Sequence, residues 1–150
     1  MKKLIVNSAI LVIIISLLGL MGCPKSNPQP DVKTQKIGYL KDKSGGWTGT
    51  ASVPTGSATT ADQWSGFKVV FTETSITTSG HPAGATAVWP SGSFTVNADV
   101  SQITRTSDGV VMQVTSLTAT SLSVRFTVPD GVVLGGRVQV LSGEYTFTLN

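Results

Sequence analysis

The sequence predicts an all-β domain of about eight antiparallel strands, which follows an apolar leader and a polar tether. Short runs rich in β-branched and aromatic residues alternate with turn signals at close spacing through residues 44–150. Several runs alternate apolar and polar side chains, as strands do when one face is buried and the other is in water. No helical period is found after Cys23. This pattern is typical of an antiparallel barrel or sandwich.

The first half of the domain contains three expected strands. Residues 47–53 form the first, and the loop 54–62 follows it. In residues 67–72 apolar side chains alternate with polar ones, which predicts a strand with one buried face. A short partner strand is expected at residues 76–78. Residues 79–90 contain two prolines and two glycines, so we expect a mobile loop there.

Short strands joined by tight turns make up the next part. Residues 93–96 and 103–105 are expected to be brief strands. Residues 107–109 read Ser-Asp-Gly, and Asp-Gly is the strongest short signal for a hairpin. This turn leads into a strand at 110–117, and residues 118–121 form the next turn.

The clearest strand signal in the chain lies at residues 122–128. Its apolar side chains share one face: Leu122, Val124, Phe126 and Val128. The intervening positions hold Ser123, Arg125 and Thr127. Strict alternation over this length predicts a half-buried strand.

The last expected strand runs from residue 137 to residue 149. Its apolar face begins at even positions, Val138 and Val140, and ends at odd ones: Tyr145, Phe147 and Leu149. The phase changes across Ser142-Gly143, and a one-residue change of phase is what a β-bulge produces. We therefore predict a bulge at Gly143, which can adopt the required backbone angles.

The leader has the layout of a signal peptide. Lys2 and Lys3 give a short basic region, and residues 10–21 are almost purely apolar. That run is too short for a membrane-spanning helix, which needs roughly 20 apolar residues.

Leu20-Met21-Gly22-Cys23 resembles the lipobox of bacterial lipoproteins. The resemblance implies that residues 1–22 are removed and that Cys23 carries a diacylglycerol. The alternative is an ordinary secretory leader with a cysteine nearby by chance. Cys23 is the only cysteine in the chain, so it cannot form an internal disulfide. Several acyl chains would hold the protein stably on a membrane.

Residues 23–43 are expected to be the lipidated cysteine and a flexible tether. Residues 24–35 contain three prolines and little apolar content, which favours an extended spacer. The lysines of the tether either lie against anionic headgroups or only add solubility. Residue 24 is proline, and by resemblance to sorted lipoproteins the absence of aspartate there indicates the outer membrane.

The charge of the expected domain argues against nucleic acid as a partner. The formal net charge of the chain is +3, but many lysines precede residue 44. From Ser44 onward there are four basic and six acidic residues, a balance of −2. A slightly acidic domain without a basic cluster is not typical of nucleic-acid binding.

Gly45-Gly46-Trp47 resembles the Gly-x-Trp motif at the start of the first strand of lipocalins. The resemblance implies a lipocalin-like β-barrel over residues 44–150, with Gly45 and Trp47 as fold-motif residues. It also implies a basic residue over the indole, for which Arg137 or Arg125 is the candidate. An immunoglobulin-like sandwich is the alternative, because it also has short alternating strands in about 100 residues.

Residue types suited to catalysis or metal binding are sparse. His81 is the only histidine, and it precedes a proline in the expected loop, so we interpret it as an exposed loop residue. Nothing singles out one serine as a nucleophile with a positioned base. One imidazole and scattered carboxylates do not predict a metal site. The sequence therefore predicts no enzyme, no cofactor and no metal.

Two tryptophans are the candidates for ligand binding. Trp64 and Trp89 lie beside loops, where an exposed indole could stack on a sugar or grip an apolar ligand. The alternative is that each closes an end of the core. We expect a non-catalytic, lipid-anchored outer-membrane lipoprotein, on the periplasmic side or the cell surface, that binds a small apolar or carbohydrate ligand. A structural or protein-interaction subunit of an envelope complex, with an unidentified protein partner, is the second possibility.

Overall fold

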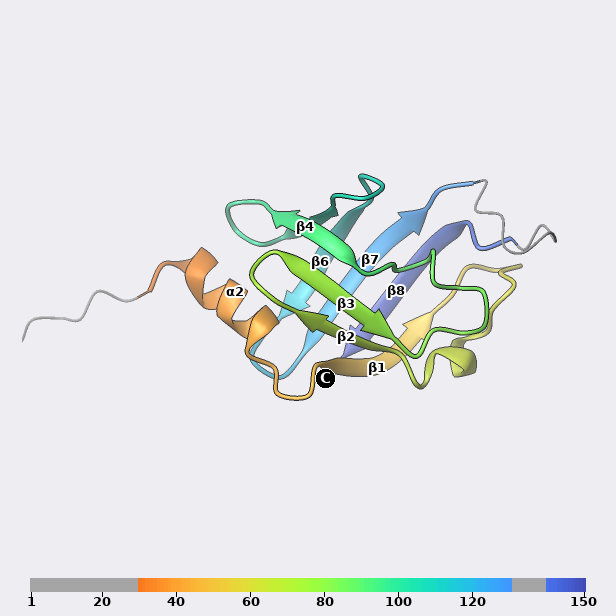
Figure 1. Ribbon diagram of the computed structural model, residues 1–150, viewed down its shortest axis with the longest axis horizontal. Helices are drawn as coiled ribbons and strands as arrows, with labels where there is room; N and C mark the ends of the chain where they lie inside the picture. Colours follow the sequence, from red (N-terminus) through yellow and green to blue (C-terminus); the bar gives the residue numbers. More distant parts are fainter. Residues whose placement is uncertain (1–29, 131–139) are drawn as a thin grey trace, which may run out of the picture.

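The computed structural model describes residues 30–130 and 140–150, and its strands form a closed antiparallel barrel (Figure 1). Each strand pairs with its neighbour in sequence, and the last pairs with the first. The strands are β1 Trp47–Ser52, β2 Lys68–Phe71, β3 Ser75–Ser79, β4 Gly92–Val96, β5 Gln102–Arg105, β6 Val111–Leu117, β7 Leu122–Val128 and β8 Gly143–Leu149. The all-β prediction is confirmed, and the fold is the lipocalin-like barrel, not the sandwich.

Closure of the barrel depends on the pairing of β1 with β8. Gly49 lies opposite Leu149 and Ser52 opposite Thr146, and the same strand β8 pairs with β7 on its other side. The strong alternation predicted for residues 122–128 is confirmed, since β7 has those bounds and its apolar side chains are all buried. One irregularity of register lies between β6 and β7, at Val114 and Ser116.

The prediction for the last strand is partly wrong. Strand β8 begins at Gly143, residues 140–142 are not in a strand, and Arg137 and Val138 lie outside the described residues. Leu141 is buried and Val140 is exposed, so the described apolar face keeps odd positions and needs no bulge. Gly143 has φ +121°, and a Cβ there would lie 2.7 Å from the Pro54 side chain. The glycine therefore allows the chain to enter β8 against Pro54.

The predicted flexible tether, residues 23–43, is wrong in its second half. Residues Val32–Lys41 form the helix α2. Asp31 caps its first turn, since its carboxylate accepts hydrogen bonds from the Thr34 amide at 3.0 Å and the Thr34 hydroxyl at 2.7 Å. Leu40 is buried in the barrel core, whereas the sequence of the helix has no marked apolar face. The stability of this helix therefore comes from its contacts with the barrel more than from an amphipathic sequence.

Two lysine side chains of α2 join it to the turns of the barrel. Lys36 Nζ donates to the Asp99 carbonyl at 2.7 Å, in the turn between β4 and β5. Lys41 Nζ lies 3.0 Å from the Glu73 carboxylate, in the turn between β2 and β3. The hydrogen bond and charge of Glu73 raise the pKa of Lys41. These lysines therefore attach the helix to the domain.

The barrel has two different ends. The end that carries α2, here called the helix end, holds the short turns 72–74, 97–101 and 118–121 (Figure 1). The opposite end, here called the loop end, holds the longer connections 53–67 and 80–91. The first of these contains a short 3₁₀ helix, η2, at Ala61–Trp64. The chain leaves the barrel toward its amino terminus from the helix end.

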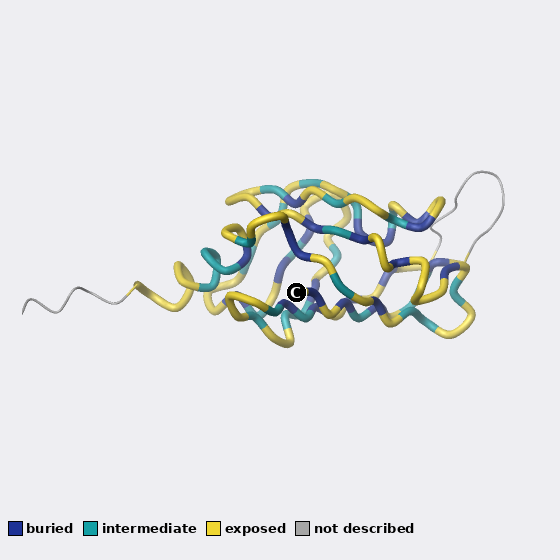
Figure 2. Tube along the Cα trace, turned by 90° about the horizontal axis from the view of Figure 1, so that it is seen from below, coloured by how far each residue is buried: buried dark blue, intermediate teal, exposed yellow. Residues whose placement is uncertain are grey.

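Aromatic side chains fill the barrel interior near the loop end. We call this set the aromatic core: Trp64, Phe67, Trp89, Phe126, Tyr145 and Phe147. Phe147 lies near the middle, with ring centroids 5.2 Å from Trp64, 5.0 Å from Phe67 and 5.1 Å from Trp89. The strands surround this core, and Figure 2 shows how buried and exposed residues alternate along them.

We expect the first turn of α2 to depend on the charge of Asp31. The hydrogen bonds from the Thr34 hydroxyl and amide lower the pKa of Asp31. A carboxyl whose pKa is lower in the folded than in the unfolded state stabilises the folded state fully above the unfolded pKa, about 3.9. This stabilisation is lost as the pH falls through the folded pKa. The Cα chemical shifts of residues 32–35 should therefore move toward coil values below about pH 4.

Two variants at Asp31 test this interpretation. In Asp31→Ala the same shifts should be coil-like at every pH, whereas Asp31→Asn should keep the cap across the acid range, because asparagine also caps helices and does not titrate there. Helical shifts in Asp31→Ala at neutral pH would contradict the assigned cap.

Candidate functional site

Trp64 and Trp89, the predicted ligand-binding residues, are both 0% exposed. Trp64 ends η2, and its Nε1 donates to Thr59 Oγ1 at 3.2 Å. Trp89 lies in the connection between β3 and β4 and packs on Phe126 and Phe147. Neither indole is available on the surface for stacking on a ligand. Their placement agrees with the alternative that each closes an end of the core.

His81 is not the exposed loop residue that the sequence suggested. Its ring is half-buried and packs edge-on against Trp64 and Phe67, with centroids 6.1 and 5.2 Å away. Its Nε2 lies 2.9 Å from the Trp89 carbonyl. A carbonyl only accepts hydrogen bonds, so Nε2 carries the proton. The loop 80–91 is therefore packed on the barrel and not free, since Ala85 and Val88 are also buried.

The Gly-x-Trp segment lies where the chain passes from α2 into the barrel. Gly45 and Gly46 have φ of +78° and +80°, and a Cβ on Gly46 would lie 2.7 Å from Val70. Trp47 is buried, and its Nε1 donates to the Leu40 carbonyl at 2.8 Å. The motif therefore joins α2 to the first strand.

The cation over Trp47 is Lys43, whose Nζ lies 5.2 Å from the ring centroid. Arg125, one of the two predicted cations, is exposed and lies 3.8 Å from Glu144 on the outside of the barrel. Arg137, the other candidate, lies outside the described residues. A cation therefore lies over the indole as the sequence predicted, but Lys43 supplies it, which the sequence did not indicate, and Arg125 does not. Cys23, the predicted lipidation site, also lies outside the described residues.

Sequence reasoning missed a buried arginine at the loop end. Arg105 is 2% exposed, and its Nε and Nη2 donate to the two oxygens of Asp108 at 3.1 and 2.6 Å. Its Nη1 donates to the Val88 carbonyl at 2.6 Å, and its guanidinium lies 5.4 Å from the Phe126 ring. The signal was present, because Arg105 shares the inward face with Ile103 and precedes an Asp-Gly turn. Three of the five guanidinium N–H groups bond within this cluster, which joins the β5–β6 turn to the loop 80–91 at the loop end.

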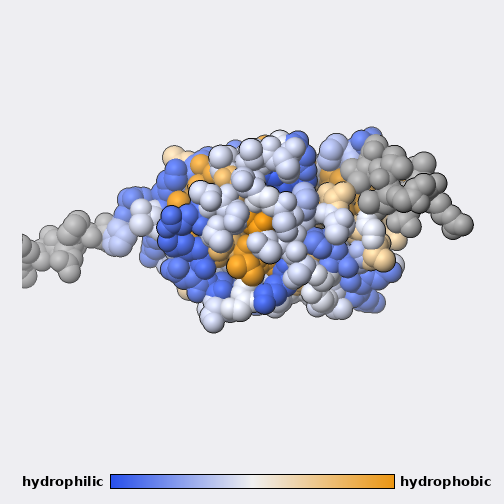
Figure 3. Space-filling model, in the orientation of Figure 1, coloured by the Kyte–Doolittle hydropathy of each residue, from blue (hydrophilic) through white to orange (hydrophobic). Residues whose placement is uncertain are grey.

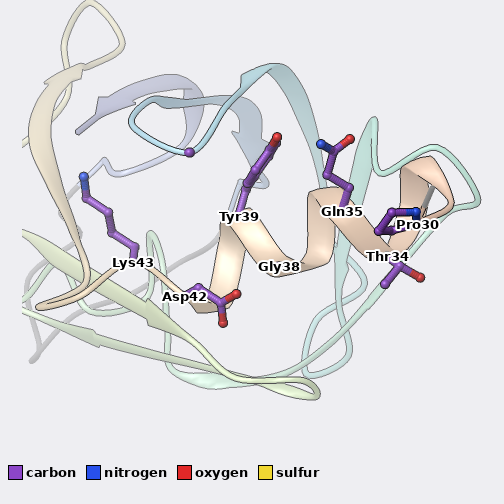
Figure 4. A pocket seen from close by; sticks show the side chains of 8 residues that line it. Pro30, Thr34, Gln35, Gly38, Tyr39, Asp42 and Lys43 are labelled. Carbon is purple, nitrogen blue, oxygen red and sulfur yellow. The ribbon is translucent and has the colours of Figure 1, made fainter. Parts of the chain in front are cut away.

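The helix end carries two grooves, one on each side of α2. One, of about 340 Å³, is lined by helix residues and by the turn between β6 and β7 (Figure 4). The other, of about 530 Å³, lies toward Glu73 in the turn between β2 and β3. Tyr39 and Gln35 project from the same side of the helix in Figure 4, with Lys43 beyond its end. These residues lie in the segment interpreted from the sequence as a tether, so they were not candidates there.

A third groove, of about 400 Å³, lies between β1 and η2 at residues such as Thr50, Ala61 and Asp62. Within residues 30–130 and 140–150, no three histidine, cysteine, aspartate or glutamate side chains gather as a metal site would require. No helix in the described part of the chain is long and apolar enough to span a membrane. We take the two grooves beside α2 as the candidate functional site, because aromatic and polar side chains, among them Tyr39, Gln35 and Asp42, line them.

Comparison with known proteins gives no family model, no curated protein and no solved structure that matches this chain.

Proposed function

We propose that this chain is an outer-membrane lipoprotein, anchored through Cys23, whose barrel domain binds a small ligand at its surface and catalyses no reaction. The leader and the Leu20–Cys23 motif support the anchor. The chain enters the barrel from the helix end, through α2. A lipid on Cys23 would therefore place the helix end nearest the membrane.

The observation that carries the binding proposal is the pair of grooves beside α2. Small-molecule sites are concave and hold roughly 300–1,000 Å³. The grooves fall in this range at about 340 and 530 Å³. The aromatic core occupies the barrel near the loop end, and α2 covers the other end with Leu40 buried beneath it. A surface site therefore suits this barrel better than an internal one.

Anchoring is tested by the pair Cys23→Ala and Ser26→Ala in the natural host. Cys23→Ala should lose incorporation of a palmitate analogue and yield either a soluble product or an uncleaved precursor, because the acylated thiol is gone. Ser26→Ala removes a hydroxyl three positions away and should behave as the wild type. Continued processing and membrane retention of Cys23→Ala would contradict the anchor.

A structural or protein-interaction subunit of an envelope complex is the second candidate. The filled aromatic core favours it, because a solid barrel offers only its outer surface to a partner. Figure 3 shows a mostly hydrophilic face on which apolar residues appear in several small, separate areas. Native mass spectrometry of the protein released from its own membranes separates the two candidates. A bound small molecule supports the proposed ligand binding, and a protein bound in stoichiometric amount supports the subunit of an envelope complex.

A further inference from the structure

Gly38 lies in the interior of α2 without an internal reason for being glycine. It has an ordinary helical backbone, and among residues 30–130 and 140–150 a Cβ at this position would meet only Asp42 Oδ2, at an ordinary 3.5 Å. Glycine destabilises a helix interior relative to alanine, because it loses more conformational freedom on folding. Neither backbone geometry nor packing against the described residues therefore explains the missing side chain.

The space left by Gly38 joins the two grooves beside α2. Both grooves are lined by Thr34, Gly38 and Asp42, which follow one another at four-residue spacing along the helix. One groove continues toward Ala119 and the other toward Glu73. Because they share these residues, the two grooves adjoin at Gly38, and we call them together the Gly38 furrow. A longer side chain at this position would divide it.

The lining of the furrow suits a neutral polar ligand with one flat face. The Tyr39 ring lies at one wall, and neither its hydroxyl nor the side-chain amide of Gln35 has a hydrogen-bond partner within the described residues. The charged groups of the furrow balance in sign, with Lys41 and Lys43 against Asp42 and Glu73. A balanced set favours a neutral ligand over a phosphate or a strongly charged peptide.

We infer that the Gly38 furrow is a carbohydrate site, in which a sugar ring stacks on Tyr39 and its hydroxyls bond to Gln35 and Asp42. This inference rests on the proposed surface binding of a small ligand. Aromatic faces combined with a few placed polar groups are the usual way in which a site orients a small ligand. The sugar can come from a glycolipid headgroup in the membrane or from a soluble oligosaccharide, because both present the same hydroxyls.

The test uses the full lipidated chain in detergent micelles, probed with an array of neutral oligosaccharides and then by calorimetric titration of the best binder. Gly38→Gln should weaken binding at least about tenfold, by filling the furrow, while it raises the thermal midpoint, because glutamine is a better helix former than glycine. Tyr39→Ala should also lose affinity. Lys33→Gln, on the same helix but outside both grooves, should bind as the wild type.

If Gly38→Gln binds less tightly but unfolds at a higher temperature than the wild type, misfolding does not explain its loss of affinity. Equal affinity of Gly38→Gln and wild type would overturn the furrow as the site. Another outcome is that the protein binds no saccharide but binds a peptide or a lipid tail, with this binding lost in Gly38→Gln. That result would overturn the ligand class and leave the proposed function in place. Glycolipid vesicles and free oligosaccharide, titrated separately, distinguish the two sources of the sugar.

Discussion

Replacing Trp64 or Trp89 with alanine is expected to lower the free energy of unfolding by about 3–5 kcal/mol, because each change opens a large cavity in the aromatic core. Both indoles are 0% exposed and lie within 5.5 Å of neighbouring core rings. Domains of this size are typically stable by only about 5–15 kcal/mol, so either variant should be strongly destabilised. Urea denaturation measures the change through the midpoint at an unchanged slope.

Phenylalanine at the same positions separates packing from hydrogen bonding. Trp64 Nε1 donates to Thr59 Oγ1, whereas Trp89 Nε1 is buried without a partner in the described part of the chain. Trp64→Phe should therefore cost more than Trp89→Phe, by about 1 kcal/mol for the lost hydrogen bond. Val70→Ala, at a partly exposed position, is the matched control and should change stability little. Wild-type stability of both alanine variants would instead favour a surface role for the indoles.

The second large effect is expected at Arg105. Arg105→Met keeps much of the apolar stem and removes the charge that bonds to Asp108 and Val88. We expect a loss of about 2–4 kcal/mol, below the range for fully buried pairs, because Asp108 is partly exposed and water can solvate its carboxylate. The Val88 carbonyl, in contrast, loses its arginine partner.

Arg125→Met is the matched control for Arg105→Met. Arg125 and Glu144 are more than half exposed and 3.8 Å apart, so removal of this pair should cost less than about 0.5 kcal/mol. Calorimetric unfolding of the two variants beside the wild type gives both values. Equal stability of the two variants would show that the Arg105 cluster does not hold the loop end together.

The predicted strands were confirmed where local alternation was strong. The apolar side chains of residues 122–128 have one arrangement that buries them together, and β7 follows it. The buried face of residues 137–149 was harder to predict, because apolar residues occupy even positions at the start and odd positions at the end. The burial of Leu141 favours the odd positions. The bulge was predicted because Val140 was assigned to the buried face, on which Leu141 lies instead.

The helix α2 was missed because its stability comes from contacts remote in sequence. Its own residues show no marked apolar face, and the surrounding prolines and lysines favoured a tether. The Asp31 cap was a visible local signal, but the contacts to Asp99, Glu73 and Trp47 are with the barrel. The candidate site was missed with the helix, because most of its lining belongs to α2.

The sequence by itself determined the strand content, the turns and the expectation of a lipid anchor, because periodicity, Asp-Gly turns and the Leu20–Cys23 motif are local patterns. Only the tertiary structure decided between barrel and sandwich, since both bury the same alternating strands and differ in whether β1 pairs with β8. It also decided that Trp64 and Trp89 are core residues and that Lys43 covers Trp47. Those outcomes depend on which distant residues meet, and local pattern does not specify that.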